Sequence, residues 1–82
     1  MDRNQIYKQI VQLIAKQFDI KPDRINGKLN FKRDLDADSI DFVELVMNLE
    51  DHFGAKISDD DARKIQTVDE AVNYIAQHVQ NN

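Results

Sequence analysis

A serine between two aspartates is the first arrangement in this sequence that could support chemistry. Ser39 follows Asp38, lies two residues before Asp41, and stands where an amphipathic helical pattern begins. Free backbone N–H groups and the positive end of the helix dipole lie at such a position, which favours a phosphate group on the serine. The two carboxylates oppose that negative charge. The alternative interpretation is that Ser39 only caps the helix, a common role for serine at a helix start.

Aspartates at alternate positions before this serine suggest a second kind of site. Asp34, Asp36 and Asp38 imitate the start of a calcium-binding EF-hand loop. That loop requires glycine at its sixth position and glutamate at its twelfth, where this chain has Ser39 and Leu45. We therefore predict no dedicated metal site. Weak divalent-cation binding among these acids stays open as an alternative.

Side chains for catalysis are sparse. The chain has no cysteine and two histidines, His52 and His78, which we expect on the solvated surface. A serine hydrolase needs a nucleophile flanked by glycines or an arranged histidine and acid, and the segment around Ser39 has no such glycines. We predict that the chain is not an enzyme. Without cysteine, any thioester chemistry would need the sulfur of a bound group.

Hydrophobic periodicity predicts the helices that position Ser39. Apolar residues recur with helical spacing over residues 4–18, 39–53 and 68–79. A short turn or helix fits Asp59–Ile65, because Ser58 and the three aspartates that follow it stabilise a helix start. No segment has the alternation of a strand. The length of 82 residues fits one domain, 1–82. The expected fold is all-α, a small four-helix bundle of three longer helices and one short helix, with a long first loop.

Helix ends and the first loop carry their own signals. Asn4 lies near the expected start of the first helix, Gly54 just beyond the second, and Thr67 before the last, where Glu70 completes a capping box. Nearly twenty irregular residues, about 19–37, form a loop long enough to be either functional or fixed to the core. The apolar residues that could fix it are Leu29, Phe31 and Leu35.

The second helix has apolar residues on two faces. On a helical wheel the core face consists of Phe42, Leu45, Val46, Leu49 and Phe53. The opposite side carries Ile40, Val43 and Met47 among the acids Glu44, Glu50 and Asp51. A helix of a monomeric bundle needs one apolar face, so the second stripe predicts a surface for other proteins. Packing of Ile40 and Val43 under the first loop is the alternative.

Charge is divided unevenly along the chain. Residues 1–33 hold eight basic and three acidic residues, a net charge of +5, whereas residues 34–82 hold three basic and twelve acidic residues, a net charge of −9. The acidic part favours basic protein partners and argues against nucleic acid as the main ligand. A contact of the basic part with an anionic membrane or RNA stays open as an alternative. Apolar runs are too short for a transmembrane segment, and no secretory signal is apparent. We expect a soluble, cytoplasmic monomer.

The segment around Ser39 resembles the phosphopantetheine attachment motif of acyl carrier proteins, and it reads Leu35-Asp36-Ala37-Asp38-Ser39-Ile40-Asp41-Phe42-Val43-Glu44-Leu45-Val46-Met47. The resemblance extends in family order over almost the whole chain. Three positions depart from the family pattern: Asp36 replaces a common glycine, Phe42 a smaller residue, and Ser58 a common proline. Aspartate tolerates a left-handed backbone better than most residues, so we expect the turn at Asp36 to survive.

The resemblance implies a carrier of acyl intermediates, held as thioesters on a covalent 4'-phosphopantetheine arm at Ser39. A phosphopantetheinyl transferase would add the arm from coenzyme A, and acyltransferases, ketosynthases and other enzymes of dissociated (type II) fatty-acid synthesis would then use it through basic docking patches. The alternatives are a carrier of a specialised polyketide, peptidyl or other acyl pathway, and a small acidic helical adaptor or calcium-binding module without a prosthetic group.

Two sets of site residues follow. The expected partner-binding residues are Asp38, Ile40, Asp41, Val43, Glu44, Met47, Glu50 and Asp51. Similar proteins hold the acyl chain among their helices, and the residues that would line such a cavity here are Phe31, Leu45, Val46, Leu49, Ile57, Ile65, Ala71 and Ile75. Core packing alone is the other role open to this second set.

Overall fold

Four helices make up the protein, and the computed structural model describes residues 2–79. They are α1 (Arg3–Phe18), α2 (Ser39–Phe53), α3 (Asp59–Lys64) and α4 (Val68–Val79), with a short 3-10 turn, η1, at Pro22–Arg24. No strand forms within the described residues. The predicted all-α bundle of three longer helices and one short helix is confirmed.

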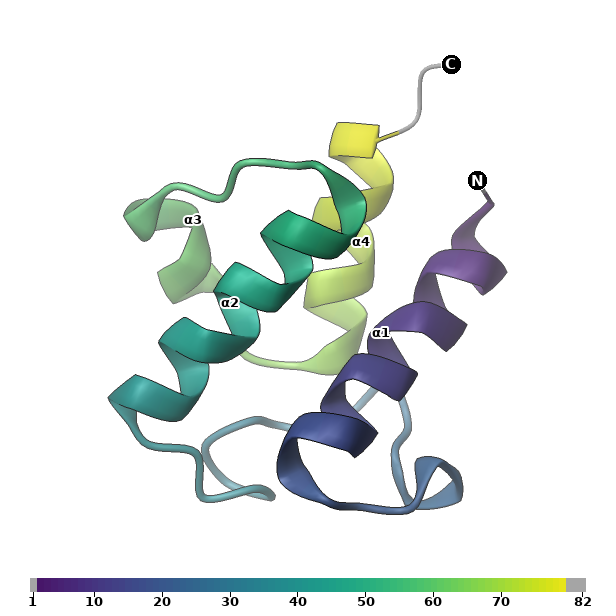
Figure 1. Cartoon of the computed structure of the whole chain (residues 1–82), viewed down its shortest axis with the longest axis vertical. Coiled ribbons are helices and arrows are strands. Elements are labelled where there is room, and N and C mark those ends of the chain that lie inside the picture. The colour runs from purple at the N-terminus through teal and green to yellow at the C-terminus, as the bar shows by residue number, and fades with distance from the viewer. Residues whose placement is uncertain (1, 80–82) are drawn as a thin grey trace.

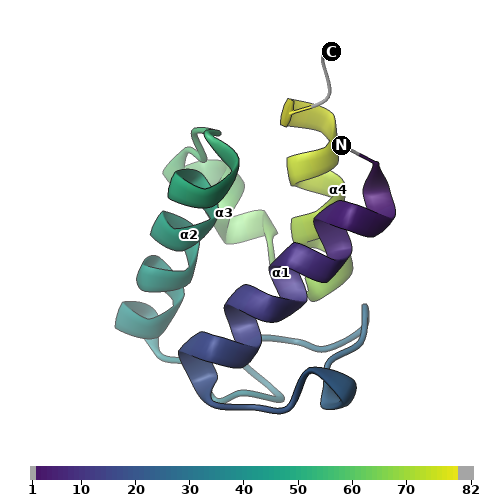
Figure 2. The ribbon, with the colours of Figure 1, turned by 45° about the vertical axis from the view of Figure 1, so that its right-hand side comes forward.

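The helices surround one core, and the long first loop closes one end of it. Helix α1 contacts both α4 and α2. The first loop crosses the end of the bundle where α1 ends and α2 begins, whereas the α2–α3 connection lies at the opposite end (Figures 1 and 2). The start of α2, which carries Ser39, therefore lies beside the first loop. None of the helices within residues 2–79 is long and apolar enough to span a membrane.

Helix boundaries agree closely with the sequence pattern, with two differences. Helix α1 is capped by Asp2, whose carboxylate accepts the backbone N–H of Gln5 at 2.8 Å, so Asn4 lies inside the helix rather than at its start. Helix α3 ends at Lys64, one residue earlier than expected. The bounds of α2 and α4 are as predicted.

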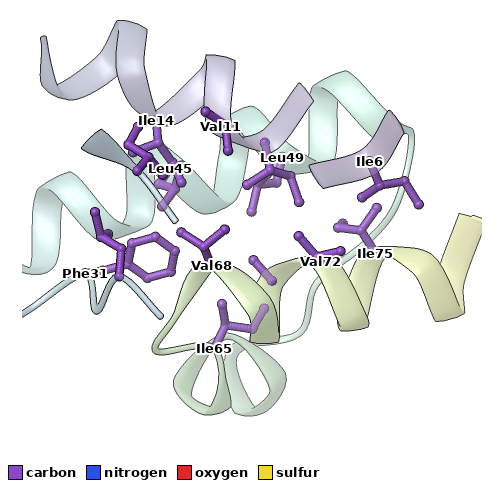
Figure 3. Packing of buried hydrophobic residues seen from close by; sticks show 14 of the residues in the cluster. Ile6, Val11, Ile14, Phe31, Leu45, Leu49, Ile65, Val68, Val72 and Ile75 are labelled. Carbon is purple, nitrogen blue, oxygen red and sulfur yellow. The ribbon is translucent and has the colours of Figure 1, made fainter. Parts of the chain in front are cut away.

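The core is built from the inward faces of α1, α2 and α4 together with apolar residues of the first loop. Figure 3 shows side chains from these elements meeting around Val68, and fully buried members include Ile14, Leu49 and Ile75. Phe31 enters this core from the first loop and is 1% exposed. Leu29 is also buried, and Leu35 packs against the core. The predicted fixing of the first loop is confirmed.

Backbone hydrogen bonds join the first loop to the start of α4. The N–H of Phe31 donates to the carbonyl oxygen of Gln66 at 3.0 Å, and the N–H of Val68 donates to that of Leu29 at 3.1 Å. These two bonds flank the junction between α3 and α4. The chain that leads into α2 is therefore held by its backbone as well as by buried side chains.

Candidate functional site

Ser39 is the first residue of α2, and its side chain is exposed. Asp38 is the N-cap: its carboxylate accepts the N–H of Asp41 at 2.9 Å, and the Asp41 carboxylate accepts the N–H of Asp38 at 3.4 Å. The interpretation of Ser39 as the cap is therefore wrong. Its hydroxyl forms no hydrogen bond with the part of the chain that the structure describes, so this oxygen is available for chemistry.

The capping arrangement also defines the electrostatics around Ser39. Both neighbouring carboxylates accept a backbone N–H, and the N–H of Phe42 donates to the carbonyl oxygen of Asp38 at 3.0 Å. Within residues 2–79, the N–H groups of Ser39 and Ile40 are left without a partner. They lie at the positive end of the α2 dipole, where an anion is stabilised. A phosphate on Ser39 fits this end of the helix.

The turn before Ser39 depends on a left-handed residue. Asp36 has a φ of 52°. Its N–H donates to the carbonyl oxygen of Lys32 at 3.1 Å, and the next N–H, that of Ala37, donates to the carbonyl oxygen of Phe31 at 3.2 Å. The expectation that aspartate would preserve this turn is confirmed. The turn brings the chain from the buried Phe31 to the exposed Ser39.

Helix α1 holds α2 in place through polar side chains that the sequence analysis did not identify. The Gln17 side-chain amide donates to the carbonyl oxygen of Asp41 at 2.9 Å, and Asn48 donates to the Gln17 side-chain oxygen at 3.0 Å. One turn further along, His52 Nε2 lies 2.7 Å from the side-chain oxygen of Gln9. The spacing of Asn48 and His52, four residues apart on one helical face, was the only signal for this interface.

A pocket of about 620 Å³ opens beside Ser39, between α2 and α3. Lys32 and Arg63 lie at this pocket with Ser39, and Phe31 and Phe42 supply apolar surface, with ring centroids 6.0 Å apart. Two of the residues expected to line an acyl cavity, Phe31 and Ile65, line this pocket. Phe31 and Ile65 are also members of the packed core, and the other six belong to that core or lie against it: Leu45, Val46, Leu49, Ile57, Ala71 and Ile75.

The second apolar stripe of α2 is exposed. Ile40 is 77% exposed, and Val43 and Met47 are each 55% exposed. The alternative in which Ile40 and Val43 pack under the first loop is therefore wrong. A row of apolar side chains this open on a small domain is typical of a protein-binding surface.

The acids expected beside this stripe differ in their bonding. Glu44 and Asp51 are exposed. Glu50 is half-buried, and its carboxylate accepts the N–H of Ile57 at 2.9 Å, which fixes the α2–α3 connection. Glu50, like Asp38 and Asp41, therefore accepts a structural hydrogen bond and also contributes to the acidic face of α2.

The alternating aspartates do not form a calcium loop. Asp34 accepts the backbone N–H of Asn30 at 2.8 Å and pairs with the guanidinium of Arg33 at 3.2 Å. The Arg33 hydrogen bond, followed by that from Asn30, lowers the pKa of Asp34. Asp38 is the cap of α2. No group of three or more His, Cys, Asp or Glu side chains suited to a metal ion occurs within residues 2–79.

Both histidines lie at the surface. His52 and His78 are exposed, and the His78 ring stacks on Tyr74 with centroids 4.0 Å apart. Neither lies at the pocket beside Ser39. The expected surface position of the two histidines is confirmed.

Comparison with known proteins supplies the family. Residues 8–75 match the family model described as "Phosphopantetheine attachment site". An acyl carrier protein of Lactobacillus johnsonii is 59% identical over 78 residues, which are 95% of this chain and 98% of that protein. An acyl carrier protein of Lactobacillus acidophilus is 51% identical, with the same coverage of both chains. The solved structure of a thermally stable acyl carrier protein from Enterococcus faecalis has a TM-score of 0.81 at 47% identity and covers 94% of this chain and 98% of its own.

The fold, the free serine at the start of α2 and these similarities agree. The chain belongs to the phosphopantetheine-binding carrier family and, within it, to the acyl carrier proteins. Its function is to carry acyl groups on a covalent 4'-phosphopantetheine arm, and it is a carrier rather than an enzyme.

Proposed function

We propose that the Ser39 hydroxyl is the attachment point of the 4'-phosphopantetheine arm. The observation that carries this proposal is the exposed Ser39 oxygen, which is free because Asp38 caps the helix. A phosphopantetheinyl transferase joins this oxygen to the phosphorus of the arm in a phosphodiester bond, with coenzyme A as the donor. The pyrophosphate bond of coenzyme A breaks, adenosine 3',5'-bisphosphate leaves, and the hydroxyl proton passes to a base of the transferase or to solvent. The free N–H groups at the start of α2 stabilise the phosphate. The thiol at the far end of the arm then holds the acyl group as a thioester.

The exposed stripe of α2 is the surface on which partner enzymes dock. Its apolar centre consists of Ile40, Val43 and Met47, and Glu44 and Asp51 stand free beside it. Basic patches on the transferase and on the enzymes of fatty-acid synthesis complement these acids. Exposed charges of this kind contribute mainly to orientation and association rate. Asp38, Asp41 and Glu50 add to the negative field from their structural positions.

The pocket beside Ser39 receives the proximal part of the arm or a short acyl group. Its apolar surface includes Phe31, Phe42 and Ile65, which suits a hydrocarbon chain. A longer chain would have to enter between core residues such as Leu45 and Leu49, which are 1% exposed. In that case α2 and α3 must separate to admit it.

The pathway that we propose is dissociated (type II) fatty-acid synthesis in the cytoplasm. The high identity to bacterial proteins that are acyl carrier proteins over almost their full length supports a free-standing carrier of this kind. Acyltransferases and ketosynthases are the expected partners.

Intact mass spectrometry tests the attachment site. Incubation of the full chain with coenzyme A, Mg²⁺ and a phosphopantetheinyl transferase should add one arm to the wild-type chain and none to Ser39→Ala. The chain has one other serine, Ser58, whose hydroxyl caps α3 by accepting the N–H of Asp61 at 3.1 Å. Ser58→Ala is the matched control and should still gain one arm. An unmodified wild-type chain, or a modified Ser39→Ala chain, contradicts the proposal.

A further inference from the structure

Basic side chains gather on the first loop of this otherwise acidic carrier. Arg24, Lys28 and Arg33 line one shallow depression of about 440 Å³, with Leu29 and Leu35 as apolar neighbours. An adjoining depression of about 570 Å³ shares Lys28 and adds Arg3 from α1. Three cations of the first loop and one of α1 are thus brought to two adjoining depressions. We call this surface, made of Arg3, Arg24, Lys28 and Arg33, the first-loop basic patch.

The four cations outnumber the carboxylates that line the same two depressions, which are Asp34, paired with Arg33, in the first and Asp69 in the second. Within residues 2–79 the salt bridges are Arg33–Asp34 and Arg63–Asp60. Arg3, Arg24 and Lys28 therefore have no ion-pair partner in the described chain, and all three are exposed. Unpaired cations at an exposed concave surface produce a positive local field that attracts a negatively charged partner.

One end of the patch, at Arg33, leads toward the site at which partner enzymes must act, although none of the four patch residues lines the pocket beside Ser39. Lys32, next to Arg33, lines the pocket that opens beside Ser39. The first loop and the start of α2 lie at the same end of the bundle (Figure 1). An enzyme that reaches Ser39 therefore approaches both the acidic α2 face and the basic first loop.

We propose that the first-loop basic patch is a second docking surface, which binds carboxylates on the enzymes that act at Ser39. The inference rests on the proposed function. One charged patch attracts a partner but leaves its rotation free, whereas two adjacent patches of opposite sign permit only one orientation. The basic patch thus fixes the rotation of an enzyme already attracted to α2, and it directs the active centre of that enzyme toward Ser39.

The neighbouring charges favour a protein partner over a membrane or nucleic acid. Anionic lipid surfaces and nucleic acids are negative throughout, so they would repel the acidic face of α2 while attracting the first loop. A protein surface can carry both signs side by side. The partner is therefore a protein with acidic residues next to a basic patch.

Charge reversal tests the proposal. Arg24→Glu/Lys28→Glu reverses the two patch cations of the loop that form no salt bridge within residues 2–79, and Lys8→Glu/Lys56→Glu makes the same change in net charge away from the patch. Lys8 lies in the first half of α1, and Lys56 lies in the α2–α3 connection at the opposite end of the bundle. Circular dichroism should confirm that both variants fold. The neutral pair Arg24→Gln/Lys28→Gln provides an intermediate case.

The readout is kcat/KM with the phosphopantetheinyl transferase and with an acyltransferase that loads the modified chain. We expect the loop reversal to lower kcat/KM about fivefold or more with at least one enzyme, the neutral pair to lower it less, and the control to stay within about twofold of wild type. The difference should shrink between about 50 and about 300 mM NaCl, because salt screens exposed charges.

Three results separate the alternatives. If wild type is modified but the loop reversal matches the control with both enzymes, the docking proposal is overturned and the carrier function stands. If wild type is not modified at all, the attachment proposal itself fails. If the loop reversal abolishes binding to phosphatidylcholine vesicles with about one-quarter phosphatidylserine while enzyme kinetics are unchanged, the patch serves a membrane and the proposal is again overturned.

Discussion

The side-chain amide of Gln17 in α1 donates to the backbone carbonyl oxygen of Asp41 in α2 across 2.9 Å. Asp41 lies two residues after Ser39, in the first turn of the helix that carries the proposed attachment site. Because Asn48 donates to the other end of the same Gln17 amide at 3.0 Å, the glutamine is held at both ends. The position of Ser39 is thus determined partly by a helix that does not contain it.

Replacing Gln17 with leucine should destabilise the fold by about 1 kcal/mol, because a part-buried hydrogen-bonded amide is lost and Asn48 loses its acceptor. Urea unfolding followed by circular dichroism measures the difference. Gln12 is exposed on the same helix, so Gln12→Leu is the control and should change the free energy of unfolding little. Equal effects of the two substitutions would mean that the Gln17 bonds contribute nothing specific.

Loss of the α2 cap should affect stability without removing the attachment oxygen. Asp38→Ala deletes the acceptor for the Asp41 N–H and should cost about 1 kcal/mol in free energy of unfolding. Asp38→Asn keeps an oxygen in the same place and should retain most of that stability. Urea unfolding compares the two, and mass spectrometry should show that both can still gain an arm. Equal stability of the alanine and asparagine variants would contradict the assignment of Asp38 as the cap.

Tyr74 makes the stability of the fold sensitive to alkaline pH. Burial of the phenol raises its pKa, and the hydrogen bond that it donates to Asp61 at 2.9 Å raises the pKa further. Since the folded-state pKa lies above the unfolded value, the protonated phenol contributes stability that is fully present below the unfolded pKa near 10 and is lost as pH rises through the folded pKa.

Tyr74→Phe removes this titration. The variant should be less stable than wild type by about 1 kcal/mol at neutral pH, because the bond to Asp61 is lost. Urea unfolding should be measured from neutral pH to above the unfolded pKa. The difference in free energy of unfolding between wild type and Tyr74→Phe should become smaller at alkaline pH. Tyr7 is the control, since its hydroxyl makes one long bond of 3.4 Å to the carbonyl oxygen of Ile25. Tyr7→Phe should therefore lower the free energy of unfolding less than Tyr74→Phe does. A constant gap across this range would contradict the role of Tyr74.

The exposed stripe of α2 should matter for recognition and not for folding. Ile40→Ser/Met47→Ser should change the free energy of unfolding by less than about 1 kcal/mol, because both side chains are largely exposed. The same variant should lower kcat/KM with the phosphopantetheinyl transferase several-fold. Leu49→Ala, on the buried side of the same helix, should instead cost about 2–5 kcal/mol of stability. Unchanged kinetics in the double variant would exclude the stripe as a docking surface.

Much of the architecture followed from local patterns. The bounds of α2 and α4 were predictable because Gly54, which has a φ of 65°, and the Thr67–Glu70 pair mark the ends of clear apolar repeats. The buried and exposed faces of α2 were equally predictable, since a helical wheel separates Leu45 from Met47. In these segments local signals and tertiary packing favour the same structure.

The details of the site depended on contacts between distant segments. Asp38 and Ser39 can both cap a helix. The residue that does so is the last one with an extended backbone, and the turn before α2 determines which residue that is. The Gln17–Asp41 bond joins residues 24 positions apart, and no local pattern predicts it. The residues expected around an acyl cavity belong to the core or pack against it, and their role in holding an acyl chain stays a prediction, because a cavity and a core require the same apolar residues at the same places.

The backbone bonds from the first loop to the start of α4 have a mechanical consequence for transport. Phe31 is buried and its N–H is bonded to Gln66, and the buried Ala37, two residues before the proposed attachment residue, donates its N–H to the carbonyl oxygen of Phe31. With the arm on Ser39 as proposed, we expect this residue to stay nearly fixed while the arm supplies the movement. The acyl group can therefore reach only points within one arm length of Ser39, and each successive enzyme must place its reaction centre within that distance.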